Sequence, residues 1–172
     1  SYNIYACNGI LFNHESPLRG ETFVTKKIVS ALCRISVNKL QEFYLGNLYS
    51  RRDWGHAKDY VVAIWKMLQQ KKAKDYVIAT GKQYSVKDFI NLVAKELKIS
   101  ISWKGRGLQE KGYLNNKKVI SIDKKYFRPT EVNSLLGDAK KARKDLNWKP
   151  QFNIRALVKD MVAEELKILK ND

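Results

Sequence analysis

Two adjacent arginines, Arg51 and Arg52, are the residues whose type and spacing are best suited to bind an anion. They stand in a predicted loop directly before Asp53 and Trp54. A helix follows at once, and residues 60–68 place apolar side chains on most of its circumference, which is typical of a buried helix. A planar guanidinium suits the paired oxygens of a phosphate or a carboxylate. Two interpretations stay open: an anion site beside a buried helix, or salt bridges on a surface loop.

A second group of basic side chains lies near the N-terminus. His14 and Arg19 fall in a predicted loop over residues 13–20. A single loop histidine without a second His, Cys or carboxylate pair is a poor metal ligand, so no metal site is predicted. Lys26 and Lys27 lie near the start of a predicted helix, where cations oppose the helix dipole unless an anion sits between them and the backbone amides.

Two further polar residues interrupt otherwise structural segments. Asn8, followed by Gly9, lies within an apolar run over residues 4–12. A buried amide needs partners, and these are either a ligand or neighbouring backbone, which the sequence leaves open. Pro129 restricts Arg128 to an extended conformation. No glycine-rich phosphate loop and no nucleophile–His set with supporting context is present, so no catalytic residue is predicted.

The elements that must position these residues follow from hydrophobic periodicity and from helix and turn signals. The run over residues 4–12 predicts a fully buried strand of a parallel sheet. Ser85 and Asp88 resemble a capping box. The remaining predictions are helices over 22–35 and 140–146, helices beginning at Val86 and after an Asn153 cap, strands over 41–45, 76–79, 99–103 and 119–123, and a mobile loop over 104–118. Alternating strands and helices indicate the α/β class.

Size and charge narrow the kind of protein. A chain of 172 residues suits one domain, or one and a part, and 44% hydrophobic with 29% charged residues excludes disorder. The net charge of +16 favours anionic partners, but the lysines are scattered, which indicates a solvated basic surface and makes nucleic acid an unfavoured partner. No membrane span or basic leader is visible, so a cytoplasmic protein is expected. Ser1 suggests a start inside a longer protein, and Cys7 and Cys33 read as reduced core thiols.

Several segments together, in order along nearly the whole chain, resemble the GDP-mannose 4,6-dehydratase family of extended short-chain dehydrogenase/reductases. The segments are residues 8–17 (NGILFNHESP) with Arg19-Gly20, 23–25 (FVT) with Lys27-Ile28, 46–48 (GNL), 52–61 (RDWGHAKDYV), 128–132 (RPTEV) and 147–150 (NWKP).

The resemblance implies a two-part enzyme, a lyase on the route to GDP-fucose. Its N-terminal Rossmann part holds NADP, and its C-terminal part holds GDP-mannose, which is converted to GDP-4-dehydro-6-deoxymannose. Residues 1–20 would be the late strand and loop of the Rossmann part, and residues 21–172 the substrate-binding α/β domain. The family's catalytic residues lie upstream of Ser1, so this chain alone is expected to be inactive. The upstream half is the implied partner, within a homo-oligomer.

Carried over by position, the resemblance also implies roles for single residues. The implied NADP contacts are His14 and Arg19. The implied substrate contacts are Asn8, Val24, Lys27, Arg52, Arg128 and Glu131. Among these, Arg52 and Arg128 would hold the pyrophosphate, and Glu131 would accept hydrogen bonds from the ribose hydroxyls, as one carboxylate can from two vicinal hydroxyls.

Two competing interpretations remain. The first is a fragment of a related nucleotide-sugar epimerase or reductase, against which the NHESP and RDWGH strings argue. The second is a basic nucleic-acid-binding module, supported by charge alone and without the interleaved aromatic and basic residues of an RNA-binding sheet. The large positive charge is not explained by the family.

Overall fold

A computed structural model describes residues 2–127 and 130–171. Its helices are α1 (Val24–Ser36), α2 (Ala57–Leu68), α3 (Val86–Glu96), α4 (Lys140–Asp145) and α5 (Ile154–Asn171), with 3-10 turns η1 (Gly107–Gln109) and η2 (Lys124–Tyr126). Its strands are β1 (Gly9–Leu11), β2 (Asn13–Glu15), β3 (Phe43–Leu45), β4 (Arg51–Arg52), β5 (Trp54–His56), β6 (Tyr76–Ile78), β7 (Tyr84–Ser85), β8 (Ser102–Lys104), β9 (Lys111–Leu114) and β10 (Lys117–Ile122). The predicted α/β class is confirmed.

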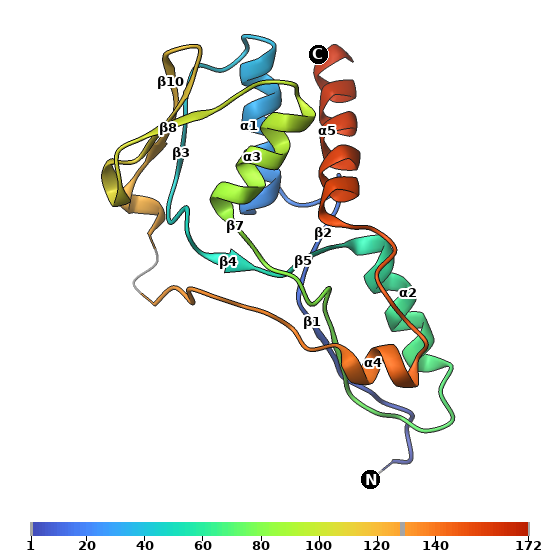
Figure 1. The fold of residues 1–172 in the computed structure, drawn as a ribbon. Coiled ribbons are helices and arrows are strands. Elements are labelled where there is room, and N and C mark those ends of the chain that lie inside the picture. The colour runs from blue at the N-terminus through green and yellow to red at the C-terminus, as the bar shows by residue number, and fades with distance from the viewer. Residues whose placement is uncertain (1, 128–129, 172) are drawn as a thin grey trace.

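One packing unit, here called the three-helix unit, consists of α1, α3, α5 and the sheet β3-β10-β9-β8. The three helices stand side by side with the sheet next to them (Figure 1). Their apolar stripes meet in one core. Fully buried members of that core include Ile28, Leu32, Phe89, Ile90, Val93, Leu157, Met161 and Ile120. The regular spacing of apolar residues on each helix therefore explains why the three helices pack together in this unit.

Local caps fix where two of these helices begin. The predicted capping box at α3 is confirmed: Asp88 N donates to Ser85 Oγ at 3.0 Å, and Ser85 N donates to Asp88 Oδ2 at 2.9 Å. Asn153 caps α5, since its Oδ1 accepts from Ala156 N at 3.0 Å. Such caps satisfy amides that have no partner inside the helix.

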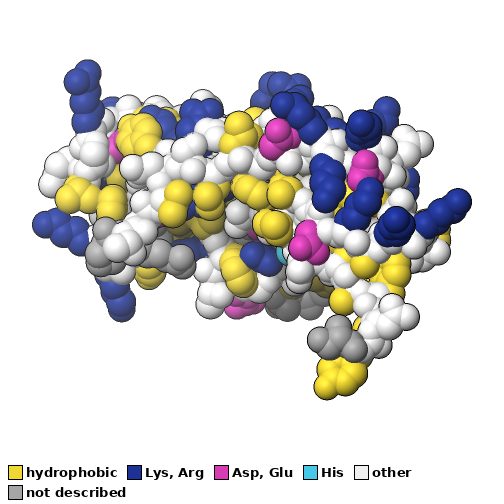
Figure 2. Space-filling view, turned by 90° about the horizontal axis from the view of Figure 1, so that it is seen from below, with side chains coloured by type: hydrophobic (Ala, Val, Ile, Leu, Met, Phe, Trp, Pro, Cys, Tyr) yellow, Lys and Arg dark blue, Asp and Glu magenta, His cyan; other side chains and the backbone are white. Residues whose placement is uncertain are grey.

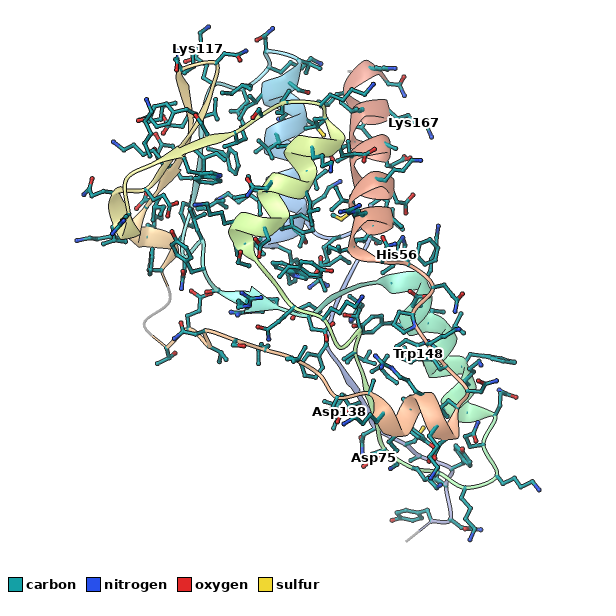
Figure 3. All side chains as sticks on the ribbon, in the orientation of Figure 1. His56, Asp75, Lys117, Asp138, Trp148 and Lys167 are labelled. Atoms are coloured by element: carbon teal, nitrogen blue, oxygen red, sulfur yellow. The ribbon has the colours of Figure 1, made fainter. Side chains whose placement is uncertain are left out.

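The second packing unit, here called the strand–helix unit, consists of β1, β6, α2 and α4. β1 and β6 are parallel, with Gly9 paired to Tyr76 and Leu11 to Ile78. Trp148, after α4, donates from Nε1 to the Asp59 carbonyl at 2.9 Å and so joins α4 to α2 (Figure 3). The Asp59 carboxylate accepts from the backbone amides of Gln151 and Phe152, each at 3.0 Å.

Short strand pairs and one histidine connect the two units. β2 pairs with β5 in parallel, and β4 pairs with β7 antiparallel. His56 is buried at the junction between the start of α2 and the foot of α5 (Figure 3). Its Nδ1 accepts from Lys58 N at 3.2 Å, and its Nε2 lies 2.9 Å from Asp160 Oδ2. Because Nδ1 accepts, the ring proton is on Nε2 and is donated to Asp160.

The predicted strand over residues 4–12 is wrong in extent and in burial. Only Gly9–Leu11 form a strand, and Ile10 is 55% exposed. β6 covers one edge of β1, and the other edge has no partner among residues 2–127 and 130–171. A strand becomes fully buried only when neighbours cover its edges and both faces, so this segment stays open here.

The prediction that α2 is buried on most of its circumference is also wrong. Tyr60, Ala63 and Met67 face the core of the strand–helix unit. The opposite side of the helix is exposed and carries Val61, Val62, Ile64, Trp65 and Leu68. We call these five residues the apolar face of α2. Seen from below, the side on which the strand–helix unit lies, the molecule shows an interrupted band of hydrophobic side chains with Lys and Arg along its margins (Figure 2).

The segment 104–118, predicted to be a mobile loop, is ordered into η1, β9 and the start of β10. Asn115 and Asn116 form the hairpin turn with φ of 49° and 64°. Two consecutive left-handed residues match the twist of a β-hairpin, and asparagine tolerates that conformation better than other residues with a Cβ. β8 begins three residues later than the predicted strand.

The predicted division of the chain at residue 20 stays a prediction. The packing groups β1 with later segments, because the core of the strand–helix unit draws on Tyr60, Tyr76 and Trp148. Among the described helices, none has both the length and the hydropathy required to cross a bilayer.

Candidate nucleotide-binding site

Arg52 and Glu131 form the centre of the candidate site. Arg52 Nη2 lies 3.2 Å from Glu131 Oε1, with 16% and 21% of the two side chains exposed. Arg52 Nη1 also donates to the Arg51 carbonyl at 2.9 Å. The guanidinium is therefore held in one orientation and remains partly accessible to an anion.

Residues 130–137, here called the return segment, are laid along β4 by backbone hydrogen bonds. Arg51 N donates to the Asn133 carbonyl at 2.8 Å, and Leu135 N donates to the Arg51 carbonyl at 3.0 Å. The Arg51 side chain points elsewhere, since its Nε donates to Gln83 Oε1 at 2.7 Å. The two adjacent arginines thus differ: Arg51 supports the strand, and Arg52 meets the carboxylate of the return segment.

A pocket of about 480 Å³ lies between the chain segment that leads into β4 and the segment that leads to the return segment. Its lining consists of Asn47, Leu48, Tyr49, Gly107, Leu108, Ile122, Lys124 and Phe127. Small-molecule pockets of this size with mostly apolar walls are common. The walls suit a flat ring system, and Asn47, Tyr49 and Lys124 supply polar groups at its edge.

A buried carboxylate supports one wall of this pocket. Glu110 receives hydrogen bonds from Tyr49 Oη at 2.5 Å and from Lys87 Nζ at 2.6 Å. Burial acts to raise the pKa of Glu110, but the bonds from Lys87 and Tyr49 outweigh it and lower that pKa below its ordinary value. Glu110 is therefore held as an anion that fixes the position of Tyr49.

The first turn of α1 carries the two lysines noted in the sequence. Lys26 is buried and paired with Glu165 of α5, with Nζ and Oε2 2.7 Å apart, so its charge is compensated inside the protein. Lys27 Nζ lies 3.7 Å from the ring centroid of Tyr126, which precedes the pocket residue Phe127. Val24 is the partly buried first residue of the helix. Lys27 is thus placed towards the segment that borders the pocket.

His14 lies in β2, so the predicted loop over residues 13–20 is wrong at its start, and Arg19 lies in the loop that follows β2. The His14 ring stacks on Tyr60 with 5.1 Å between centroids, and its Nδ1 is 3.0 Å from the Phe12 carbonyl oxygen. Arg19 Nε lies 3.1 Å from Glu15 Oε2, and the guanidinium carbon lies 3.5 Å above the Phe23 ring.

Glu15, the last residue of β2, joins that strand to α1, because Thr25 Oγ1 also donates to its Oε2, at 2.6 Å. Burial raises the pKa of Glu15 above its ordinary value, against the opposing effects of Thr25 and Arg19. The carboxylate therefore holds Arg19 in place and ties the loop to the first turn of α1.

The structure brings some of the predicted site residues together and leaves others apart. Arg52 and Glu131 are in direct contact, and Lys27 approaches the pocket segment through Tyr126. Asn8 is not part of this group. Its backbone and side-chain nitrogens donate to Asp75 Oδ1 at 2.7 and 3.1 Å, at the lower end of the molecule (Figure 3). Arg128 lies outside the described residues.

Sequence reasoning missed the buried carboxylates that hold the candidate side chains. Glu15 directly follows His14, and Asp53 directly follows Arg52, so adjacency to a basic candidate was an available signal. Glu110 had no such signal, because its partner Lys87 is distant in the sequence. Within the described residues, no group of three or more His, Cys, Asp or Glu side chains is arranged to hold a metal ion.

Comparison with known proteins identifies relatives along almost the whole chain. The sequence profile of the family "GDP-mannose 4,6 dehydratase" matches residues 1–161. The chain is 50% identical over 173 residues to the GDP-mannose 4,6 dehydratase of Dictyostelium discoideum, covering 99% of this chain and 49% of the relative. It is 49% identical over 180 residues to the GDP-mannose 4,6-dehydratase of Vibrio cholerae, covering 98% and 48%. The chain thus spans about half the length of the curated relatives it matches.

Solved structures share the fold at low sequence identity. RMD from Pseudomonas aeruginosa, complexed with NADPH, superposes with a TM-score of 0.76 at 16% identity, over 95% of this chain and 48% of that one. The dTDP-glucose 4,6-dehydratase of Bacillus anthracis, in complex with NAD, gives 0.72 at 15% identity, over 98% and 47%. These likenesses confirm the predicted fold, that of the C-terminal part of an extended short-chain dehydrogenase/reductase. Because the family profile matches residues 1–161 and the relatives are about 50% identical to it, the chain belongs to the GDP-mannose 4,6-dehydratase family.

Proposed function

We propose that this chain is the nucleotide-sugar-binding portion of a GDP-mannose 4,6-dehydratase, a lyase that converts GDP-mannose to GDP-4-dehydro-6-deoxymannose with bound NADP. The observation that carries the proposal is the oriented Arg52–Glu131 pair on the two chain segments that also wall the apolar pocket. Residues 47–49 lead into β4, and residues 124–127 lead towards Glu131. A base in the pocket would therefore place its sugar and phosphates along the path to Arg52.

The chemistry of these groups matches a nucleoside diphosphate. The Arg52 guanidinium offers a planar donor pair to the pyrophosphate, and Arg128 is proposed as its second cation. Glu131 can keep Arg52 oriented through one oxygen and accept ribose hydroxyls through its remaining lone pairs. Lys27 and the backbone near Val24 would line the nucleotide pocket from α1. The proposed role of Asn8 has no support from its contacts, which are with Asp75.

A nicotinamide cofactor is proposed because structural relatives are described with NADPH or NAD. The residues of this chain fit an anionic dinucleotide. Part of the Arg19 guanidinium remains accessible, while Glu15 and Phe23 fix its position. The His14 ring is held in place by stacking on Tyr60. We propose NADP, contacted by His14 and Arg19. Bound there, it would supply reversible hydride transfer, and the residues of this chain would only bind and orient it.

The remaining parts of the enzyme are proposed to come from a nucleotide-binding half like that of the longer relatives, within a homo-oligomer. Two features of the strand–helix unit support such a partner. β1 has one edge unpaired among residues 2–127 and 130–171, and α2 exposes its apolar face. An open strand edge and an exposed apolar surface are both sites where another structural layer packs.

The function is tested by titrating GDP into the chain by calorimetry, with Arg52→Ala and Arg51→Ala as a matched pair. Arg52→Ala should weaken GDP binding by about 2–4 kcal/mol, the scale for removing one member of a desolvated charge pair. Arg51→Ala should leave the affinity nearly unchanged, because its side chain bonds Gln83. Arg52→Lys should restore only part of the affinity, since an ammonium lacks the planar fork.

Absence of GDP binding by the wild-type chain would contradict the proposal. If the wild type, Arg51→Ala and Arg52→Ala all bind GDP with equal affinity, both arginines are ordinary surface residues. Melting curves of all variants complete the experiment, because a purely structural role of Arg52 predicts lost stability with unchanged affinity.

A further inference from the structure

Asp53 is a completely buried carboxylate, with 0% of its surface exposed, directly after Arg52. Its Oδ1 accepts from Thr80 N at 2.9 Å and from Thr80 Oγ1 at 2.6 Å. Its Oδ2 accepts from Gly81 N at 2.8 Å and from Gly137 N at 3.4 Å. A carboxylate surrounded by converging donors is bound far more firmly than a solvated one.

These donors belong to two segments that are distant from Asp53 in the sequence. Thr80 and Gly81 follow β6, and the Thr80 carbonyl is itself bonded by Arg143 Nη2 at 2.8 Å. Gly137 ends the return segment, which carries Glu131 near its other end. Asp53 therefore fastens the corner between β4 and β5 to β6 and to the return segment.

The packing around Gly137 leaves the return segment little freedom at this point. A Cβ added there would collide with the Ala79 side chain and approach the Phe12 ring at 3.0 Å. The segment is thus held at its end by Asp53 and close packing, and in its middle by the two Arg51 backbone bonds. Arg52 and Glu131 therefore meet only if β4 and the return segment keep their positions relative to each other.

We propose that Asp53 is the positioning residue of the candidate anion site. It holds Arg52 and Glu131 in the geometry that receives a nucleoside diphosphate, without touching the ligand itself. The inference rests on the proposed function, because it assigns Asp53 a role in the same binding site. It goes further by making the affinity of that site depend on a carboxylate outside it.

The chain offers a closely matched control. Asp59 is also buried and also accepts from two backbone amides, those of Gln151 and Phe152. Its contacts fasten α2 to the segment before α5 and do not involve β4 or the return segment. Asp53→Asn and Asp59→Asn therefore make the same chemical change, in which an amide group faces N–H donors and leaves at least one of them unpaired.

Thr80 provides a milder change in the same network. Thr80→Val keeps the shape of the side chain but removes the hydroxyl that donates to Asp53, whereas Thr80→Ser keeps the hydroxyl. A purely steric role of Thr80 predicts the opposite order of the two variants. This pair also decides the question if Asp53→Asn does not fold.

The experiment measures GDP affinity of the full chain by calorimetry, below the melting temperature of every variant. Asp53→Asn should weaken GDP binding by about tenfold, the scale of one buried donor left unpaired, and Asp59→Asn by less than about twofold. Thr80→Val should weaken it measurably, and Thr80→Ser should restore it. Hydrogen exchange supplies a second readout: the Leu135 amide should exchange faster in Asp53→Asn than in Asp59→Asn.

Equal affinities and equal exchange in the two aspartate variants would overturn the role of Asp53. An equal loss of affinity in both would overturn it as well, because general destabilisation would then suffice. If the wild-type chain does not bind GDP, the proposed function fails, and the exchange rate of Leu135 alone decides whether Asp53 positions the return segment.

Discussion

α1 and α2 are amphipathic helices of similar length, but the chain covers their apolar sides to different degrees. In α1, the inner residues Ile28, Val29 and Leu32 are completely buried by α3, α5 and the sheet. In α2, the core of the strand–helix unit covers only one side, and Trp65 on the other side is 61% exposed. The difference teaches that apolar composition predicts a helix but does not reveal whether its covering layer lies in the same chain.

The comparison has a chemical counterpart. The three-helix unit compensates a buried charge internally, through Lys26 and Glu165. The strand–helix unit instead presents an edge of β1 that has no partner among the residues the structure describes, together with the apolar face of α2. The first unit is complete in itself, and we expect the second to become complete only against the proposed nucleotide-binding half.

The largest expected effect comes from leucine-to-alanine substitutions in the two helices. Leu32 is completely buried in α1, whereas Leu68 in α2 is 55% exposed. Leu32→Ala should lower the free energy of unfolding by about 2–5 kcal/mol, because it leaves a cavity. Leu68→Ala should change it by less than about 0.5 kcal/mol. Urea unfolding followed by circular dichroism measures both, and similar losses would mean that α2 is covered in solution by another copy or segment.

The next effect is a dependence of the stability of the three-helix unit on pH, through the buried Glu165. Burial acts to raise the pKa of Glu165, but the bonds from Lys26 and Ser30 outweigh it, so this pKa lies below its ordinary value of 4.5. A lowered carboxyl pKa stabilises the folded state above pH 4.5, and this contribution is lost as the pH falls through the folded-state pKa.

Melting curves between neutral pH and pH 3 test this sign. The loss of stability on acidification should be smaller in Glu165→Gln than in the wild type. The control is Glu164→Gln on the same helix, where the partner Lys167 is 3.8 Å away and 44% of the Glu164 side chain is exposed. An acid profile of Glu165→Gln identical to that of Glu164→Gln would contradict the internal compensation described for the three-helix unit.

The smallest expected effect on stability is at the apolar face of α2. Trp65→Lys should leave the free energy of unfolding within about 0.5 kcal/mol but reduce self-association, because an exposed apolar patch promotes contact between molecules. Sedimentation velocity over a range of concentrations measures it. The control is Lys167→Ala on the exposed side of α5, which should leave the association unchanged. If Trp65→Lys also leaves it unchanged, the contact between molecules does not involve the apolar face of α2.

How much of this the sequence could predict differs between its parts. Helical periodicity sufficed for α3, whose stripe from Val86 to Ala94 is buried as expected. The hairpin over 104–118 could not be predicted, because its strands are short, polar and glycine-containing and show no clear alternation. Within this segment β9 is ordered by pairing with β8 and with β10, and pairing between strands leaves little trace in the sequence of a single segment.

The candidate site was predictable in its residue types but not in its division of roles. Arg51 and Arg52 are equivalent by residue type and by position in the predicted loop, and only the family resemblance singles out Arg52. They are distinguished by Gln83, which lies 32 positions from Arg51, and by Glu131, which lies 79 positions from Arg52. Such contacts depend on the return segment, whose placement no local pattern specifies. The family resemblance pointed to Arg52 and Glu131 as site residues, and the structure shows the contacts that hold these two side chains in place.

The pairing of α1 with α5 has a consequence for how the chain folds as it is synthesised. Lys26 and its partner Glu165 are separated by 139 positions. At typical elongation rates of about 5–20 residues per second, the inner side of α1 would wait roughly 7–28 seconds for α5. During that interval an apolar stripe and an unpaired ammonium are presented on the nascent chain. The three-helix unit thus depends on α5, a helix that is synthesised long after α1.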